Sequence, residues 1–245
     1  MTRKETLRIF RIWSQTLLPS VISTSLYFLI FGSFIGSRIG LIGEVTYLQF
    51  IIPGLVMMSV ITNAYSNVVA SVFSAKFQRN IEELLVSPLT STVILLGYII
   101  GGVVRGVLVG FLVFLVSLYF TPLPVTHPWI VVSTILGTAI LFSLLGFVNA
   151  VFARKFDDIA IVPTFVLTPL TYLGGVFYSV HHLPAFWQKV SFFNPILYLV
   201  NSFRYGFLGI SDISVSASLI TMGLLIAGLW GIALFLLQRG VGLRQ

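Results

Sequence analysis

Six long apolar runs dominate this 245-residue chain and restrict it to folds that suit a lipid environment. A helix needs about 20 mostly apolar residues to cross the hydrocarbon core of a bilayer. Only 9% of the residues are charged, whereas soluble domains use about a quarter. We therefore predict an all-α integral membrane protein that forms a single transmembrane domain over residues 1–245. Its six expected transmembrane helices are residues 17–35, 50–73, 93–120, 129–152, 159–179 and 215–237.

The Lys and Arg residues between these runs indicate the orientation, because such residues accumulate on the cytoplasmic side of membrane proteins. With the N-terminus inside, ten of them fall in inner segments and three in outer segments. This asymmetry predicts that both termini are cytoplasmic, and it explains the net charge of +7 without nucleic acid as a partner. The inner residues are Arg3, Lys4, Arg8, Arg11, Lys76, Arg79, Arg154, Lys155, Arg239 and Arg244, and the outer ones are Arg38, Lys189 and Arg204.

The segment before the first apolar run, residues 3–16, has the pattern of a helix that lies in the lipid headgroup plane. Its basic side chains, Lys4, Arg8 and Arg11, follow one side, and apolar side chains follow another. We therefore expect an interfacial helix that contacts membrane lipid.

The outer segment 183–209 is too apolar for a solvated loop. Asn194 and Pro195 in its middle are typical of a helix cap followed by a first turn. The pattern predicts two short helices that dip into the outer leaflet, which requires protein or a water-filled cavity around their ends. A pair of helices lying on the membrane surface fits the same pattern.

The third run contains the residue that is most costly to place in a membrane. Arg105 lies near its middle, where a charge costs about 2.5–3.5 kcal/mol on insertion scales. Gly102, Gly106 and Gly110 surround it at the spacing that lets two helices approach closely. We expect these glycines to pack tightly against another helix. Arg105 must then face either the helix bundle or a cavity, since no Asp or Glu lies in any of the six runs.

Polar residues form a stripe along the second run. Ser59, Asn63, Ser66 and Asn67 recur at intervals of three and four, which places them on one face of a helix. The stripe serves either hydrogen bonds between helices or one wall of a polar transport path.

The fifth run is interrupted by Pro163, Pro169 and the pair Gly174-Gly175. A proline inside a helix removes a backbone hydrogen bond and bends the helix. We therefore expect this transmembrane helix to be kinked.

A compact charged stretch, "AKFQRNIEELLVSPLT", separates the second and third runs. Its apolar residues share one face of a helix over residues 76–87, which Ser87 and Pro88 end. Such a helix either lies on the inner leaflet or docks into a partner's groove. Its balanced charge favours docking, because anionic lipid would select an excess of Lys and Arg. The apolar face consists of Phe77, Ile81, Leu84 and Leu85.

Motifs for catalysis, metal binding or nucleotide binding are absent from the sequence. The three histidines fall in outer segments, and no G-x-x-x-x-G-K-[ST] loop is present to bind nucleotide phosphates. We therefore expect neither catalytic residues nor a metal or cofactor site, and no ATP hydrolysis by this chain alone.

Five stretches together resemble the bacterial ABC-2 type export permeases, including the nodulation-factor exporter permeases. They follow one another in the family's order and cover essentially the whole chain. The stretches are "RNIEELLVSPLT", "GYIIGGVVRG", "FDDIAIVPTFVLTPLTYLGGVFYSV", "LPAFWQKVSFFNPILYLVNSFRYGFLG" and "QRGVGLR".

The resemblance implies a bacterial inner-membrane dimer of two six-helix permeases with two separate cytoplasmic ATPase subunits, which bind ATP and Mg. It makes 76–87 the helix that couples to the ATPase, 3–16 the connecting helix and 183–209 a re-entrant pair. It also places the substrate path at the dimer interface, lined by the second and fifth helices. The expected coupling residues are Phe77, Arg79, Ile81, Glu82, Glu83 and Leu84, and the expected polar residues of the path or bundle are Asn63, Asn67, Arg105, Thr168 and Tyr172.

We therefore expect the permease subunit of an ATP-binding cassette exporter that moves an amphipathic, glycan or lipid substrate. An ion-coupled secondary transporter is the main alternative, because its broken helices also contain prolines at membrane depth. Such transporters usually have an intramembrane carboxylate, which these runs lack. A membrane scaffold whose polar stripe and glycines serve only packing is a third possibility.

Overall fold

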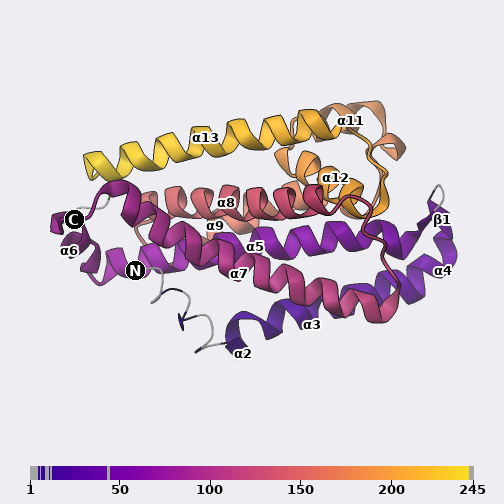
Figure 1. Cartoon of the computed structure of the whole chain (residues 1–245), viewed down its shortest axis with the longest axis horizontal. Coiled ribbons are helices and arrows are strands. Elements are labelled where there is room, and N and C mark those ends of the chain that lie inside the picture. The colour runs from indigo at the N-terminus through magenta and orange to yellow at the C-terminus, as the bar shows by residue number, and fades with distance from the viewer. Residues whose placement is uncertain (1–4, 6, 9–10, 12, 43–44, 243–245) are drawn as a thin grey trace.

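The computed structural model describes residues 5, 7–8, 11, 13–42 and 45–242. Long helices run side by side along the molecule and are joined at its two ends (Figure 1). The long elements are α3 (Leu18–Tyr27) with its continuation η1 (Phe28–Ile35), α5 (Tyr47–Phe77), α7 (Ser91–Phe120), α8 (Pro128–Phe152) and α13 (Val215–Arg239).

Shorter elements connect these helices. Two strands, β1 (Leu41–Ile42) and β2 (Val45–Thr46), form an antiparallel pair before α5. The segments η1 and η2 are π-helical, with wider turns than an α-helix, and η3 is a 3₁₀ turn. The remaining short elements are α2 (Trp13–Thr16), α4 (Gly36–Ile39), α6 (Asn80–Val86), α9 (Asp158–Val162), η2 (Pro163–Leu167), α10 (Thr168–Tyr172), η3 (Val180–His182), α11 (Ala185–Phe192) and α12 (Pro195–Leu208).

Five helices in the described part of the chain are long and apolar enough to cross a membrane. They coincide with the first, second, third, fourth and sixth predicted spans, so the all-α membrane class is confirmed. The fifth predicted span, 159–179, is shorter than expected, because α9, η2 and α10 together end at Tyr172. The chain turns at Gly174-Gly175, where Gly175 has a φ of 69° that glycine adopts without strain.

Helix α5 is the centre of the bundle, and most of its side chains are buried along its whole length. A capping box starts it: the Gln49 N–H donates to Thr46 Oγ1 at 3.3 Å, and the Thr46 N–H donates to Gln49 Oε1 at 3.1 Å. Helices α7 and α8 pack along α5, whereas α3 and α13 expose most of their apolar side chains. Exposed apolar flanks of this kind suit lipid or another membrane helix.

The glycines of the third span lie against α5. A Cβ at Gly106 would come within 2.9 Å of the Ala64 Cβ, and a Cβ at Gly110 within 2.5 Å of a Val60 methyl. At Gly102 the added atom would collide with Ser143 Oγ of α8. These three positions therefore let α7 approach both α5 and α8.

The predicted single helix over 76–87 is wrong at its start. Helix α5 continues through Lys76 and Phe77, and α6 begins only at Asn80. Arg79 separates the two helices with a φ of 61°, a left-handed conformation that costs an L-residue about 1–2 kcal/mol. The apolar spacing is continuous across this break, so the pattern alone did not reveal it.

The predicted interfacial helix, 3–16, is described only in part. Glu5, Leu7, Arg8 and Arg11 are helical and α2 follows them, while Lys4 lies outside the described residues.

The predicted outer pair over 183–209 is present as α11 and α12. Asn194 caps α12 by accepting the Ile196 N–H at 3.0 Å, and Pro195 occupies the first turn, as predicted. The depth of these helices in the membrane stays a prediction.

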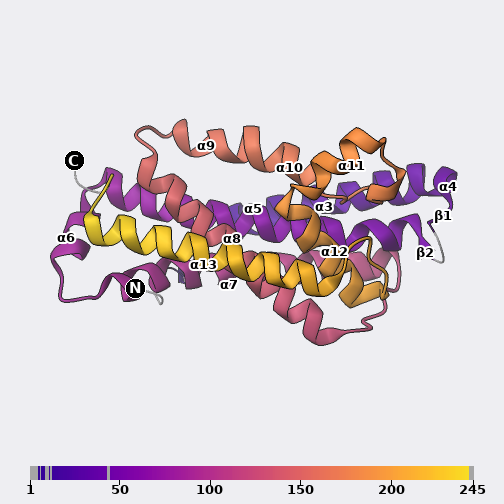
Figure 2. The same cartoon turned by 90° about the horizontal axis from the view of Figure 1, so that it is seen from above.

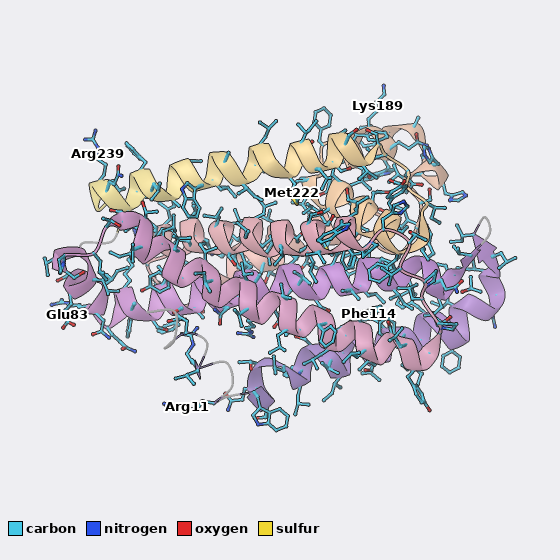
Figure 3. All side chains as sticks on the ribbon, in the orientation of Figure 1. Arg11, Glu83, Phe114, Lys189, Met222 and Arg239 are labelled. Atoms are coloured by element: carbon cyan, nitrogen blue, oxygen red, sulfur yellow. The ribbon has the colours of Figure 1, made fainter. Side chains whose placement is uncertain are left out.

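Helices α6 and α11 lie toward opposite ends of the bundle (Figure 1). Glu83 of α6 and Arg239 at the end of α13 lie at one end, and Lys189 of α11 lies near the other (Figure 3). The strand β1 and α4 also lie at the end opposite α6 (Figure 1). Figure 2 shows α9 and α10 along one edge of the bundle, apart from α7 and α13.

Candidate functional site

A groove of about 240 Å³ opens between α3 and α5, and its mostly apolar wall carries several hydroxyl groups and one amide. Asn63 of the predicted stripe reaches it and donates from Nδ2 to Ser20 Oγ at 2.9 Å. Thr24 and Ser59, which also line the groove, share a hydrogen bond of 3.2 Å. Hydroxyl and amide groups from two helices therefore lie in its wall.

Arg105 lies behind this wall. Its Nε donates to Asn63 Oδ1 at 3.3 Å, and its Nη2 donates to the Thr16 carbonyl at 3.5 Å. In the described part of the chain, Arg105 reaches the groove through Asn63 rather than lining it. It links α7, α5 and the start of the first span, so it orients the groove's amide and places a positive charge behind it.

Asn67 belongs to a second polar cluster, closer to α6. Arg8 donates from Nη2 to Asn67 Oδ1 at 3.2 Å and forms an ion pair with Glu5 at 3.1 Å. Ser71 Oγ donates to the other Glu5 oxygen at 2.8 Å. Glu5 is buried, so this cluster anchors the N-terminal segment to α5.

Arg8, one of the basic side chains of the predicted interfacial helix, therefore faces Asn67 and Glu5, while the contact of this helix with lipid stays a prediction. Sequence reasoning also missed Glu5. Its spacing of three from Arg8 is the signal that was available, because residues i and i+3 are neighbours on a helix.

Tyr172 and Thr168 have different surroundings. Both belong to the fifth segment, which consists of α9, η2 and α10. Tyr172 stacks on Phe177 with 5.8 Å between ring centroids, and Phe177 lies 4.9 Å from Phe31 and 6.2 Å from Tyr27. We call these four residues the outer aromatic cluster. Tyr27 also lines the groove, so the cluster brings Tyr172 near one end of it.

Thr168 remains on the exposed edge of the fifth segment. Its hydroxyl donates to the Pro163 carbonyl at 2.9 Å, within the π-helical turn. Wide turns of this type are frequent at functional sites, and the two prolines, which cannot donate a backbone hydrogen bond, account for this one. The structure does not bring Thr168 to Asn63.

The residues expected to couple to an ATPase differ in exposure. Arg79 and Glu83 are exposed, and Glu82 and Leu84 are half-buried. Phe77 exposes 61% of its surface, whereas Ile81 exposes only 2%. The side chains exposed at α6 therefore include the charges of Arg79 and Glu83 and the apolar Val86, which is 86% exposed, whereas Ile81 attaches α6 to the bundle.

A cavity of about 1000 Å³ lies between the N-terminal segment, the end of α5, α6 and the start of α7. Its lining includes Arg8, Arg11, Gln78, Glu83 and Tyr98. Charges of both signs meet at this end of the molecule.

Lys76 was predicted only as a charge that sets topology, yet it is 5% exposed. Its Nζ donates to the carbonyls of Val151 and Ala153 at 2.8 and 2.7 Å, at the end of α8. The sequence shows that residue 76 is basic. It does not show which groups Lys76 binds, because the two carbonyls lie 75 and 77 residues away.

The connection between α8 and α9 begins directly after these carbonyls. The N–H groups of Arg154 and Lys155 donate to the Asp158 carboxylate at 2.7 and 3.0 Å. These two bonds hold the pKa of the Asp158 carboxyl below its usual value. A lowered folded-state pKa stabilises this turn at neutral pH, and the contribution is lost as the pH falls through that pKa.

Arg204 was counted as an outer charge, but it is 1% exposed within the cap formed by α11, α12 and the turn at Gly175. It donates from Nε to the Phe50 carbonyl at 3.3 Å and from Nη2 to the Gly175 carbonyl at 2.5 Å. Its guanidinium carbon lies 3.8 Å from the centre of the Phe50 ring. Arg204 therefore fastens α12 to α5 and to the turn that follows α10.

Residues 1–208 match the family described as ABC-2 type transporter. The chain is 58% identical over 243 residues to the inner membrane transport permease YadH of Escherichia coli strain K12, covering 99% of this chain and 94% of that protein. The protein of the same name from Shigella flexneri gives the same values. Nodulation protein J of Rhizobium leguminosarum bv. viciae is 31% identical over 72 residues, which are 29% of this chain and 28% of that protein.

Proposed function

Because this multi-pass inner-membrane permease belongs to the ABC-2 type transporter family, we propose that a separate cytoplasmic ATPase powers it and that it exports an amphipathic, glycan or lipid substrate. Two copies of the chain pair, and each copy binds one ATPase subunit through α6. ATP and Mg are bound by the ATPase subunits. This chain contributes the membrane path and the surface that receives their movement.

The observation that carries the proposal is the pair of exposed charges at α6, at the end of the bundle where basic residues gather. Arg79 is exposed directly before α6 and Glu83 is exposed on it, whereas Ile81 of the same short helix is buried in the bundle. Described basic residues at this end include Lys76, Arg154, Lys155 and Arg239, in agreement with a cytoplasmic side. A helix seated in the bundle and charged toward the cytoplasm suits docking to a soluble subunit. In this proposal Phe77, Arg79, Glu82 and Glu83 contact the ATPase, while Ile81 and Leu84 hold α6 in place.

The groove between α3 and α5 supports a path between two copies of the chain. Its wall offers Ser20, Ser59 and Asn63, while the neighbouring surfaces of α3 and α9–α10 expose apolar side chains. A second copy facing these surfaces encloses a passage with polar patches and aromatic borders, which suits an amphipathic substrate. Closure of the ATPase subunits then tilts the helices, and nucleotide shifts the two states only by its different affinity for them.

Glu5 adds an observation in favour of ion-coupled secondary transport, because it is a buried carboxylate beside the second span. However, its two oxygens already engage Ser71 and Arg8. A carboxylate that accepts a hydroxyl hydrogen bond and forms an ion pair with a guanidinium is poorly placed to exchange a coupling ion. Uptake driven by an ion gradient in vesicles that contain only this chain would support the alternative.

The orientation is tested with a single cysteine, since the chain has none of its own. In intact cells, a membrane-impermeant maleimide should leave Gln78→Cys unlabelled and should label Lys189→Cys, at the opposite end. Permeabilised cells should label both. Labelling of Gln78→Cys in intact cells would place α6 outside and remove the basis for an ATPase contact.

Docking is tested by reversing the charge on the outward face of α6. The double variant Glu82→Arg with Glu83→Arg should weaken co-purification of the ATPase on the order of tenfold, because reversed interface charges repel their former partners. It should also abolish the stimulation of ATP hydrolysis by the permease.

Asp157→Arg is the control for the docking test, because it reverses an exposed charge at the same end but outside α6. It should bind and stimulate as the unaltered chain does. Normal binding and stimulation by the double variant, with an unchanged elution profile, would contradict docking through α6.

A further inference from the structure

The fifth segment lies far from α6 in sequence and along the edge of the bundle. Helix α6 is joined covalently to α5 and α7, whereas α9 follows α8 and is set apart from α7 and α13 (Figure 2). Movement that begins at α6 therefore needs a noncovalent connection before it reaches α9. Two contacts at the inner end supply one.

The first contact is a lysine that caps another helix. The last carbonyls of an α-helix have no donors within that helix, and a cation at this end is favoured by the helix dipole. The buried Lys76 ammonium supplies donors to the Val151 and Ala153 carbonyls from the last turn of α5. The inner ends of α5 and α8 are thereby held together by two short charge-assisted bonds.

The second contact is aromatic. Phe156, in the connection between α8 and α9, meets Phe73 and Phe77 of α5 edge-on, with ring centroids 4.9 and 5.2 Å apart. Such edge-to-face geometry makes the contact directional, and only Phe73 of the three rings is buried. Phe156 is held toward α5 because Asp158 fixes the backbone of the two residues before it. The start of α9 is thus attached to the end of α5.

We propose that Lys76, Phe73, Phe77 and Phe156 form an inner link that passes the movement of α6 to α8 and α9. The proposal rests on the proposed docking of an ATPase to α6 and adds how the fifth segment follows it. Lys76 and Phe156 are positioning residues in this scheme, since they act through the helices that they join. Lys76 binds the carbonyl of the first residue of the five-residue connection 153–157, and Phe156 is its fourth residue, so the link constrains the connection near both of its ends.

The test measures two movements separately in the complex of the permease with its ATPase. A nitroxide label at Asn80→Cys in each copy reports the movement of α6, and a label at Ala160→Cys in each copy reports the movement of α9. In each sample the distance between the two labels is measured by pulsed electron paramagnetic resonance. Both positions are exposed. Addition of a non-hydrolysable ATP analogue should change both distances in the otherwise unaltered chain.

Phe156→Ala should leave the change at Asn80 intact and reduce the change at Ala160 to less than half. Phe152→Ala is the matched control, because Phe152 is 60% exposed, lies four residues away and has no aromatic contact with the described residues. It should leave both changes intact. A full response at Ala160 in Phe156→Ala would overturn the link.

Lys76 provides an independent second series. Lys76→Met should lose the response at Ala160 while retaining that at Asn80, and Lys76→Arg, which keeps a cation and its donors, should restore at least half of it. Equal responses in Lys76→Met and the unaltered chain would overturn the role of the lysine. If the unaltered chain shows no nucleotide-dependent change at Asn80, the docking proposal itself fails, and the inner link fails with it.

Discussion

Replacing Gly102 by leucine should prevent α7 from packing against α5 and α8. The yield of folded protein should therefore fall to a small fraction of that of the unaltered chain. An added Cβ alone would collide with Ser143 Oγ and would lie 2.6 Å from a Val68 methyl and 3.0 Å from the Ala64 carbonyl. The carbonyl belongs to the backbone of the central helix and cannot move aside. Overpacking of a well-filled core costs about 1–3 kcal/mol and sometimes more, and a leucine adds three carbon atoms beyond the Cβ.

The measurement is the yield of monodisperse protein after detergent extraction, followed by its thermal unfolding. Gly228→Leu is the control, because a Cβ at Gly228 on α13 meets nothing within 4 Å in the described part of the chain. This control should express and unfold normally. A monodisperse Gly102→Leu protein with an unchanged unfolding temperature would contradict close packing at this helix crossing.

Replacing Arg204 by leucine should release the outer cap from α5. The change removes two hydrogen bonds from a charged donor, worth about 1.5–3 kcal/mol each, and a desolvated cation–π contact worth about 2 kcal/mol. The cost of burying the guanidinium offsets part of that loss, so we expect a net destabilisation on the order of 3 kcal/mol. Arg204→Lys should be intermediate, because an ammonium lacks the planar fork that reaches both carbonyls.

Loosening of the cap is measured by the reaction of a cysteine at Val176, which is fully buried next to Gly175. Val176→Cys should react slowly with a maleimide in the otherwise unaltered protein and at least tenfold faster with Arg204→Leu. Lys189→Met, which removes an exposed cation from the same cap, should not change the rate. Equal rates with and without Arg204 would show that other contacts hold the cap closed.

The sequence predicted the class of fold and most of its helices, because crossing a bilayer requires apolar runs of a definite length. It extended the fifth span too far, since the residues after Tyr172 are as apolar as a membrane helix. Only the backbone turn at Gly175 shows that the helix has ended. The prediction also treated 76–87 as one helix, although the end of α5 and the whole of α6 occupy it. The apolar spacing fits one continuous helix as well as it fits two helices that are separated at Arg79.

The sequence predicted the candidate site only where the residues that act together lie close to one another in the chain. The stripe with Asn63 and the glycines around Arg105 follow from helix periodicity, which is local. Lys76 and Arg204 were counted only as charges that indicate the topology, because the carbonyls that they bind belong to distant parts of the chain. Their contacts depend on how helices associate, and a single sequence does not specify this.

The π-helical turns in the first and fifth segments have one further consequence. A π-turn holds one residue more than an α-turn, and when it migrates along a helix, the residues it passes rotate by about 100° and advance by about 1.5 Å. The inner link and the stack of Tyr172 on Phe177 lie outside η2, so both can remain in place when the π-turn of the fifth segment shifts. If these segments line the proposed path, such a change of helical phase would exchange the side chains presented to a substrate without a wide separation of the two ends of the permease.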